Sequence, residues 1–161
     1  MSASHDLIEG VMTKQLKPLP DERGLLMELL RSDEPIFERF GQVYVTVCKP
    51  RIVKGWHYHK VQTDHFVCLQ GQAKVVLYDA RKQSKTFGKI NEFVFGWHNP
   101  LMIKIPTYVY HGFTAVGDKD AMILNISTEV YRYQDPDEYR ASPFSSEIPY
   151  DWGDVDKTLS H

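Results

Sequence analysis

The sequence predicts an all-β fold, a barrel or sandwich of antiparallel strands. Three observations lead to it: short runs rich in β-branched residues, recurrence of such runs at roughly ten-residue spacing, and turn residues between them. A chain of 161 residues suits one domain with a substantial core. We expect residues 1–161 to form that single domain, with the barrel over about 16–139 and a tail, 140–161, packed on it.

The expected elements follow in chain order. An extended segment over Met12–Pro20 contains two prolines that exclude a helix, and a turn follows at Asp21–Gly24. A short helix is expected over Glu34–Phe40, with Asp33 as N-cap and Pro35 in the first turn. Strands are then expected over these ranges: Val43–Cys48, Trp56–Gln70 as one strand or two, Ala73–Asp79, Phe87–Gly96, Leu101–Ile105, Phe113–Val116 and Ala121–Thr128.

Composition excludes several classes of partner. A net charge of −2 gives no reason to expect nucleic acid or an anionic membrane. No run of about eighteen apolar residues is present, so no membrane-spanning helix is expected. Met1–Glu9 lacks the basic region and apolar run of a secretory signal. Cys48 and Cys68 lie in apolar β-patterned runs, which indicates buried thiols in a reducing compartment, and we expect the cytoplasm.

Three histidines form the main candidate for chemistry. His57 and His59 are two residues apart on an expected strand, so their side chains point to the same face. His111 follows a proline-containing turn on a later strand. Because histidine titrates near neutral pH and is the commonest metal ligand, the sequence predicts a cluster inside the barrel that holds either a proton or a metal ion.

Four motifs in the same order resemble a known family. They are the Asp21-Glu22-Arg23-Gly24 turn, the Gly55-x-His57 strand, the Asp79-x-Arg81-x-x-Ser84-x-Thr86-x-Gly88 string and the Pro106–Phe113 segment. With them the chain resembles the dTDP-4-dehydrorhamnose 3,5-epimerase family of the cupin superfamily, from about Leu16 to Tyr139. The resemblance implies a jelly-roll barrel, a homodimer that exchanges its N-terminal strands, a nucleotide-diphospho-4-keto-6-deoxy sugar as substrate, and proton transfer at C3 or C5 without a cofactor.

The resemblance also implies roles for individual residues. His57 takes the position of the catalytic base, and Tyr131 or Tyr133 that of the tyrosine that donates a proton from the opposite face. His111 is expected to line the sugar site. Arg23 is expected to touch the nucleotide bound by the neighbouring subunit.

At three positions the chain departs from the family. Lys54 stands where the family has an arginine that binds diphosphate, so it keeps the charge and loses bidentate geometry. His59 replaces a glutamine, and Asp64 aligns with a lysine that steadies the enolate oxygen. The carboxylate that partners the base is not identified by alignment, and Asp154 and Asp156 are both candidates.

Two alternative functions remain open from the sequence. His57, His59, Asp64 and His111 fit the ligand spacing of a metal cupin, which would hold one divalent transition metal and act as a sugar isomerase or a dioxygenase. A bound metal would not exclude the epimerase, since it could hold the enolate oxygen as a Lewis acid. The other alternative is a non-catalytic barrel that binds a nucleotide sugar.

Overall fold

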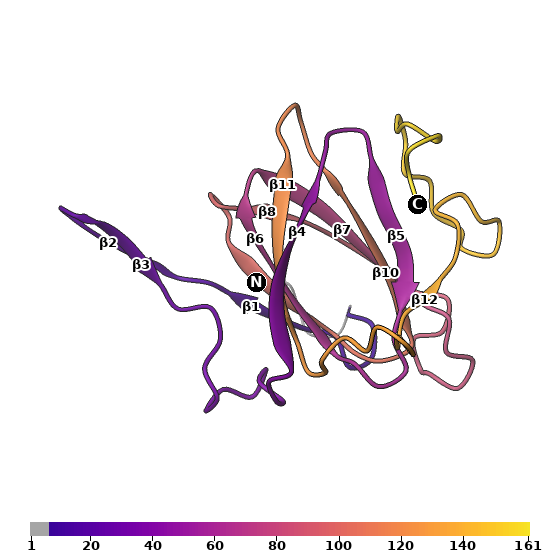
Figure 1. The fold of residues 1–161 in the computed structure, drawn as a ribbon, viewed down its shortest axis with the longest axis horizontal. Helices are drawn as coiled ribbons and strands as arrows, with labels where there is room; N and C mark the ends of the chain where they lie inside the picture. The colour runs from indigo at the N-terminus through magenta and orange to yellow at the C-terminus, as the bar shows by residue number, and fades with distance from the viewer. Residues whose placement is uncertain (1–6) are drawn as a thin grey trace.

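The protein is an antiparallel β-barrel with a projecting hairpin (Figure 1). The computed structural model describes residues 7–161, so most of the Met1–Glu9 segment considered above lies outside the described residues. The predicted all-β fold is confirmed. No helix of the described part is long and apolar enough to cross a membrane.

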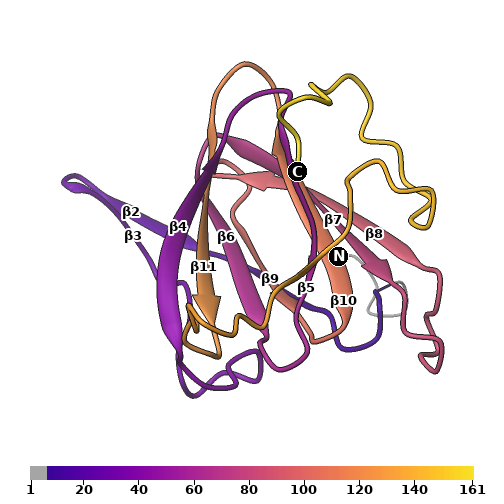
Figure 2. The ribbon, with the colours of Figure 1, turned by 45° about the vertical axis from the view of Figure 1, so that its right-hand side comes forward.

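The strands of residues 7–161 form two five-stranded sheets and a two-stranded hairpin. The first sheet has the order β1-β9-β6-β11-β4, the second β12-β5-β10-β7-β8, and β2 pairs with β3. Figure 2 shows β4, β11 and β6 on one side of the barrel and β5, β10, β7 and β8 on the other. The strands span β1 Met12–Gln15, β2 Pro18–Asp21, β3 Gly24–Met27, β4 Gln42–Cys48, β5 Val53–Tyr58, β6 Asp64–Gln70, β7 Gln72–Asp79, β8 Ile90–Gly96, β9 Leu101–Ile105, β10 Val109–Ala115, β11 Ala121–Ser127 and β12 Tyr139–Arg140.

Alternation along each strand separates the barrel interior from its surface. On β4, Tyr44 and Thr46 line an interior cavity, whereas Val43, Val45 and Val47 are exposed on the outer face. The interior is filled with apolar side chains from both sheets, including Val75, Leu77, Phe95, Ile103 and Ile123. Cys48 and Cys68 belong to this core as free, buried thiols, as predicted.

A β-bulge on β5 decides which of its side chains face inward. Pairing with β10 runs His57↔His111 and Phe113↔Lys54, so β5 carries one extra residue between the two pairs. The extra residue reverses the alternation, and both Lys54 and His57 line the interior cavity. Trp56 points to the other face, where it packs against Trp152 of the C-terminal tail at 5.0 Å between ring centroids.

The short helix predicted over Glu34–Phe40 is wrong, because the segment forms turns without a helix. One turn bond is present, from the Phe37 amide to the Glu34 carbonyl at 3.0 Å. Ile36 is buried beside Val67 in a separate core cluster, and its carbonyl accepts a hydrogen bond from His65 Nε2 at 2.9 Å. The tertiary contacts of Ile36 therefore fix the segment in a conformation other than the predicted helix.

Candidate active site

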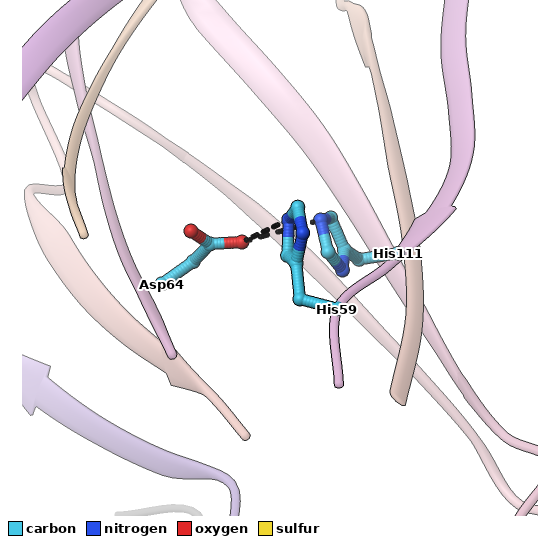
Figure 3. Close-up of side chains that lie close together, drawn as sticks. All are labelled: His59, Asp64 and His111. Atoms are coloured by element: carbon cyan, nitrogen blue, oxygen red, sulfur yellow. Dashed lines mark ion pairs between the residues drawn. The ribbon is translucent and has the colours of Figure 1, made fainter. Parts of the chain in front are cut away.

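A buried carboxylate joins two histidines at the centre of the site (Figure 3). One oxygen of Asp64, Oδ2, lies 3.1 Å from His59 Nε2 and 3.4 Å from His111 Nε2. Asp64 begins β6 in the first sheet, His111 lies on β10 in the second, and His59 directly follows β5. The cluster therefore connects the two walls of the barrel.

The other oxygen of Asp64 is held by two amides. Oδ1 accepts hydrogen bonds from Gln62 Nε2 at 2.7 Å and from Asn125 Nδ2 at 2.8 Å. Burial alone would raise the pKa of Asp64, but the hydrogen bond and charge of His59, with help from His111 and Asn125, hold that pKa well below its usual range. Asp64 is therefore a carboxylate at neutral pH, despite being buried.

His59 carries the matching positive charge. Burial opposes its protonation, yet the hydrogen bond and charge of Asp64 and the carbonyl of Asp137 raise the pKa of His59 to about 9. The Asp137 carboxylate in turn accepts the backbone amides of residues 60, 61 and 62 at 2.8–2.9 Å, which fixes the loop that carries His59. At neutral pH the structure therefore holds an imidazolium–carboxylate pair.

His57 and His111 are neutral under the same conditions. Burial, reinforced by the charges of His111 and Arg140, lowers the pKa of His57 to about 3. Burial outweighs the charge of Asp64 and lowers the pKa of His111 to about 4. His57 Nε2 lies 4.0 Å from Glu138 Oε1, and Glu138 is held by Arg140 through Oε2 at 3.0 Å. A neutral imidazole is the form that can accept a proton.

These side chains surround a cavity of about 260 Å³ between the two sheets, called the inner cavity below. A neighbouring cavity of about 670 Å³, the outer cavity, shares Tyr44, His59, Glu138 and Arg140 with it. The inner cavity is lined by Tyr44, Thr46, Lys54, His57, His59, Asp64, Phe66, His111, Phe113, Glu138, Arg140 and His161. The inner cavity is polar and charged, and the larger outer cavity adjoins it.

The structure brings five of the predicted site residues together in the inner cavity: Lys54, His57, His59, Asp64 and His111. Tyr131 and Tyr133 line the outer cavity only, with 42% and 84% of their surface exposed, and their role as acid remains a prediction. Arg23 lies at the tip of the β2–β3 hairpin, paired with Asp21 at 2.6 Å, far along the projection that Figure 1 shows. Its contact with nucleotide also remains a prediction.

Sequence reasoning missed Tyr44, Asn125 and Glu138. Alternation over the predicted strand Val43–Cys48 would place Tyr44 on the same face as Thr46, and that face proves to line the inner cavity. Nothing in the sequence marks Glu138 as the carboxylate that faces His57.

The two aspartates considered as partners of His57 lie elsewhere. Asp154 pairs with Arg51 at 3.0 Å, and Asp156 accepts hydrogen bonds from Thr158. Neither residue lines the inner cavity.

A barrel of two antiparallel sheets with histidines facing an interior cavity is typical of cupins, and known proteins specify the class further. The chain belongs to the family described as "Polysaccharide biosynthesis C-terminal domain", which it matches over residues 19–139. It is 41% identical over 146 residues to the "Probable low-salt glycan biosynthesis epimerase Agl13" of Haloferax volcanii, covering 89% of each chain. It is 37% identical over 146 residues to the spore coat polysaccharide biosynthesis protein SpsL of Bacillus subtilis, covering 91% of this chain and 97% of that one.

Solved structures agree with this assignment. A dTDP sugar isomerase from Desulfovibrio desulfuricans matches with a TM-score of 0.85 at 34% identity, over 94% of this chain and 96% of that one. The expected relationship to dTDP-4-dehydrorhamnose 3,5-epimerases is confirmed, since enzymes of that name are among the matched proteins. The jelly-roll fold is thereby confirmed, and the chain is an isomerase of the epimerase type.

Proposed function

We propose that this protein inverts C3, C5 or both in a nucleotide-diphospho-4-keto-6-deoxy sugar, during the biosynthesis of a deoxysugar for a polysaccharide or other glycan. The observation that carries the proposal is a neutral imidazole, His57, lining an inner cavity of about 260 Å³ between the two sheets. Relatives named as a glycan biosynthesis epimerase and a dTDP sugar isomerase support the substrate class.

The chemistry follows from the charges in that cavity. A hydrogen on the carbon beside a ketone can be removed by a positioned base, and His57 is available in the basic form at neutral pH. Removal leaves negative charge on the ketone oxygen, which positive groups stabilise. Lys54 and the imidazolium of His59 line the same cavity and can supply that charge. The neighbouring cavity of about 670 Å³ offers room for the nucleotide.

Exchange of solvent deuterium tests this function. With dTDP-4-keto-6-deoxyglucose in heavy water, we expect deuterium to enter C3 or C5, and His57→Ala to slow that entry by about 10²–10⁴-fold. The matched control is His98→Asn, an exposed turn histidine whose replacement should leave exchange unchanged. If a folded wild-type protein binds nucleotide sugars but exchanges no hydrogen, the non-catalytic alternative is favoured instead.

We also propose that the enzyme is a homodimer. The β2–β3 hairpin projects from the barrel (Figure 1). Leu19, Leu25 and Leu26 of the hairpin are exposed, and so are the valines on the outer face of the edge strand β4. Such apolar surface suits a second copy of the chain, and Arg23 at the hairpin tip would then approach the partner's cavity. Light scattering should give twice the mass of 18.7 kDa, and Leu26→Glu should shift it toward one chain.

The two free, buried cysteines support a reducing compartment, and we propose the cytoplasm as the location. Fractionation of cells that express the protein would test this.

A bound divalent metal ion is a second candidate, favoured by one specific observation. One ligand atom each from His59, Asp64 and His111 lie within 4.8 Å of one another. The donors fit: two ligands about 2.1 Å from a tetrahedral ion are roughly 3.4 Å apart, which matches the 3.1 and 3.4 Å separations above. These three residues would hold the ion, which would supply a Lewis acid for the ketone oxygen. His57, the fourth ligand predicted from the sequence, lies outside this group and would stay available as the base.

Elemental analysis distinguishes the two forms of the site. Protein purified without chelator should contain about one equivalent of a transition metal if the ion is resident. Exchange activity that survives EDTA, with less than roughly a tenth of an equivalent of metal, would favour proton transfer by side chains alone. His111→Ala provides a matched loss of one ligand, and it should reduce the metal content if an ion is bound.

A further inference from the structure

We propose that Tyr44 is the group that delivers a proton to the substrate carbon on the face opposite His57. The inference rests on the epimerase function proposed above and identifies a residue for the second half of that reaction. It depends on the position of Tyr44, on the orientation of its hydroxyl group and on its separation from His57 across the cavity.

Tyr44 and His57 lie on opposite walls of the same cavity. Tyr44 is on β4, at the edge of the first sheet, and His57 is on β5 in the second sheet (Figure 2). A single lysine side chain bridges these walls, since Lys54 Nζ of β5 reaches Thr46 Oγ1 of β4 at 3.0 Å. A flat sugar-derived enolate between the walls would present one face to each residue.

Hydrogen bonds fix the direction of the Tyr44 hydroxyl. Asn125 lies directly opposite Tyr44 in the β4–β11 register and is completely buried. Its Oδ1 accepts the His65 amide at 3.1 Å, and therefore its Nδ2 is the donor that meets the Tyr44 oxygen at 2.9 Å. Nδ2 also donates to Asp64, which confirms the amide orientation. Because the Tyr44 oxygen accepts, its own proton is left to be given to a ligand.

The environment of Tyr44 keeps that proton in place until it is needed. Although 41% of the residue is exposed, its hydroxyl is the end that contacts buried Asn125. Burial, with the negative charges of Asp64 and Glu138, raises the pKa of Tyr44 to about 12. The resting group is therefore the phenol, which is an acid and not a base.

The proton count of the step is balanced. His57 takes the proton from the carbon beside the ketone, and the C–H electron pair becomes the enolate. Tyr44 gives its O–H proton to the same carbon from the other face, and the enolate pair forms the new C–H bond. An imidazolium and a tyrosinate remain, and both return to their starting forms by exchange with water through the outer cavity.

The test separates deuterium exchange from inversion in the full-length enzyme. Tyr44→Phe keeps the ring and removes only the hydroxyl. We expect it to exchange the carbon-bound hydrogen within about tenfold of wild type, because His57 can return deuterium to the same face, while inverted product falls about 10²–10⁴-fold. Tyr108→Phe, at an exposed tyrosine outside both cavities, is the matched control and should leave both rates unchanged.

Three outcomes would overturn the assignment. Inversion by Tyr44→Phe close to the wild-type rate would show that the hydroxyl is not the donor. An equal fall of exchange and inversion would show that Tyr44 is only structural. A selective loss of inversion in Tyr131→Phe, with Tyr44→Phe active, would assign the acid to Tyr131. Wild-type protein that neither exchanges nor inverts would instead refute the epimerase function on which the inference rests.

Discussion

The imidazolium–carboxylate pair of His59 and Asp64 predicts an unusual loss of stability in mild alkali. A histidine whose pKa is higher in the folded protein binds its proton more tightly there, so the stabilisation is complete below pH 6.5 and is lost as the pH rises toward 9. A tenfold change in proton affinity is worth about 1.4 kcal/mol, so the rise from 6.5 to about 9 stabilises the fold by about 3 kcal/mol at full protonation. Between pH 6.5 and 8.5 about 2 kcal/mol of this should disappear. The lowered pKa values of His57 and His111 act in the opposite direction and return a little under about 1 kcal/mol, so the net fall should be about 1 kcal/mol.

Urea denaturation of protein dialysed against EDTA measures this loss. Removing metal matters because an ion bound by His59 would displace the proton and abolish the effect. We expect the free energy of unfolding to fall through this range at a slope that never exceeds about 1.4 kcal/mol per pH unit. Burial raises the pKa of Cys48 and of Cys68, so these thiols add to the loss only at higher pH.

Two variants show whether His59 is responsible. His59→Asn should abolish the fall between pH 6.5 and 8.5, because the group that loses its proton there is gone. His98→Asn, at an exposed turn, should keep the wild-type slope. The reasoning is refuted if wild-type stability stays level or rises over this range, or if the slope persists without His59.

Two further predictions follow from the geometry of β5. Because the pKa of His57 is lowered to about 3, this base stays neutral in mild acid, and the rate of deuterium exchange should not change from pH 7 to 5.5. With a histidine of ordinary pKa as the base, the exchange rate would fall about tenfold over the same range. A pH profile of exchange, with circular dichroism as a check on folding, measures this. Gly55→Ala should destabilise the fold by about 1–3 kcal/mol, because a Cβ there would lie 2.6 Å from the Gly112 Cα and φ is +154°. Gly153→Ala is the control, since φ is also positive there and a Cβ meets nothing within 4 Å. Urea unfolding of both variants separates the clash from the shared backbone effect, and equal losses would contradict the clash.

Local patterns were sufficient for most of the barrel. The strand expected over Val43–Cys48 is β4, and the break expected between Gln70 and Ala73 is present, since β6 ends at Gln70 and β7 begins at Gln72. Strand β10 begins at Val109, four residues before its predicted start at Phe113, so His111 and Gly112 both belong to the strand. The missing helix at Glu34–Phe40 has a tertiary cause, the burial of Ile36, which no local pattern contains.

The sequence predicted the relative positions of site residues that lie on the same strand. It predicted less well the contacts that depend on a bulge or on the pairing of distant strands. Two-residue spacing correctly placed His57 and His59 on one face, and both line the inner cavity. Simple alternation would put Lys54 on the opposite face from His57, and only the bulge brings them together. The approach of Glu138 to His57 depends on the pairing of β12 with β5, two segments some eighty residues apart in sequence.

Backbone hydrogen bonds hold His161 against β5, the strand that carries the base. The His161 amide donates to the Val53 carbonyl and its carbonyl accepts the Gly55 amide, both at 3.1 Å, while its side chain borders the inner cavity. Deleting residues 157–161 would therefore leave the Val53 carbonyl and the Gly55 amide without these partners, and it should loosen the strand that positions His57.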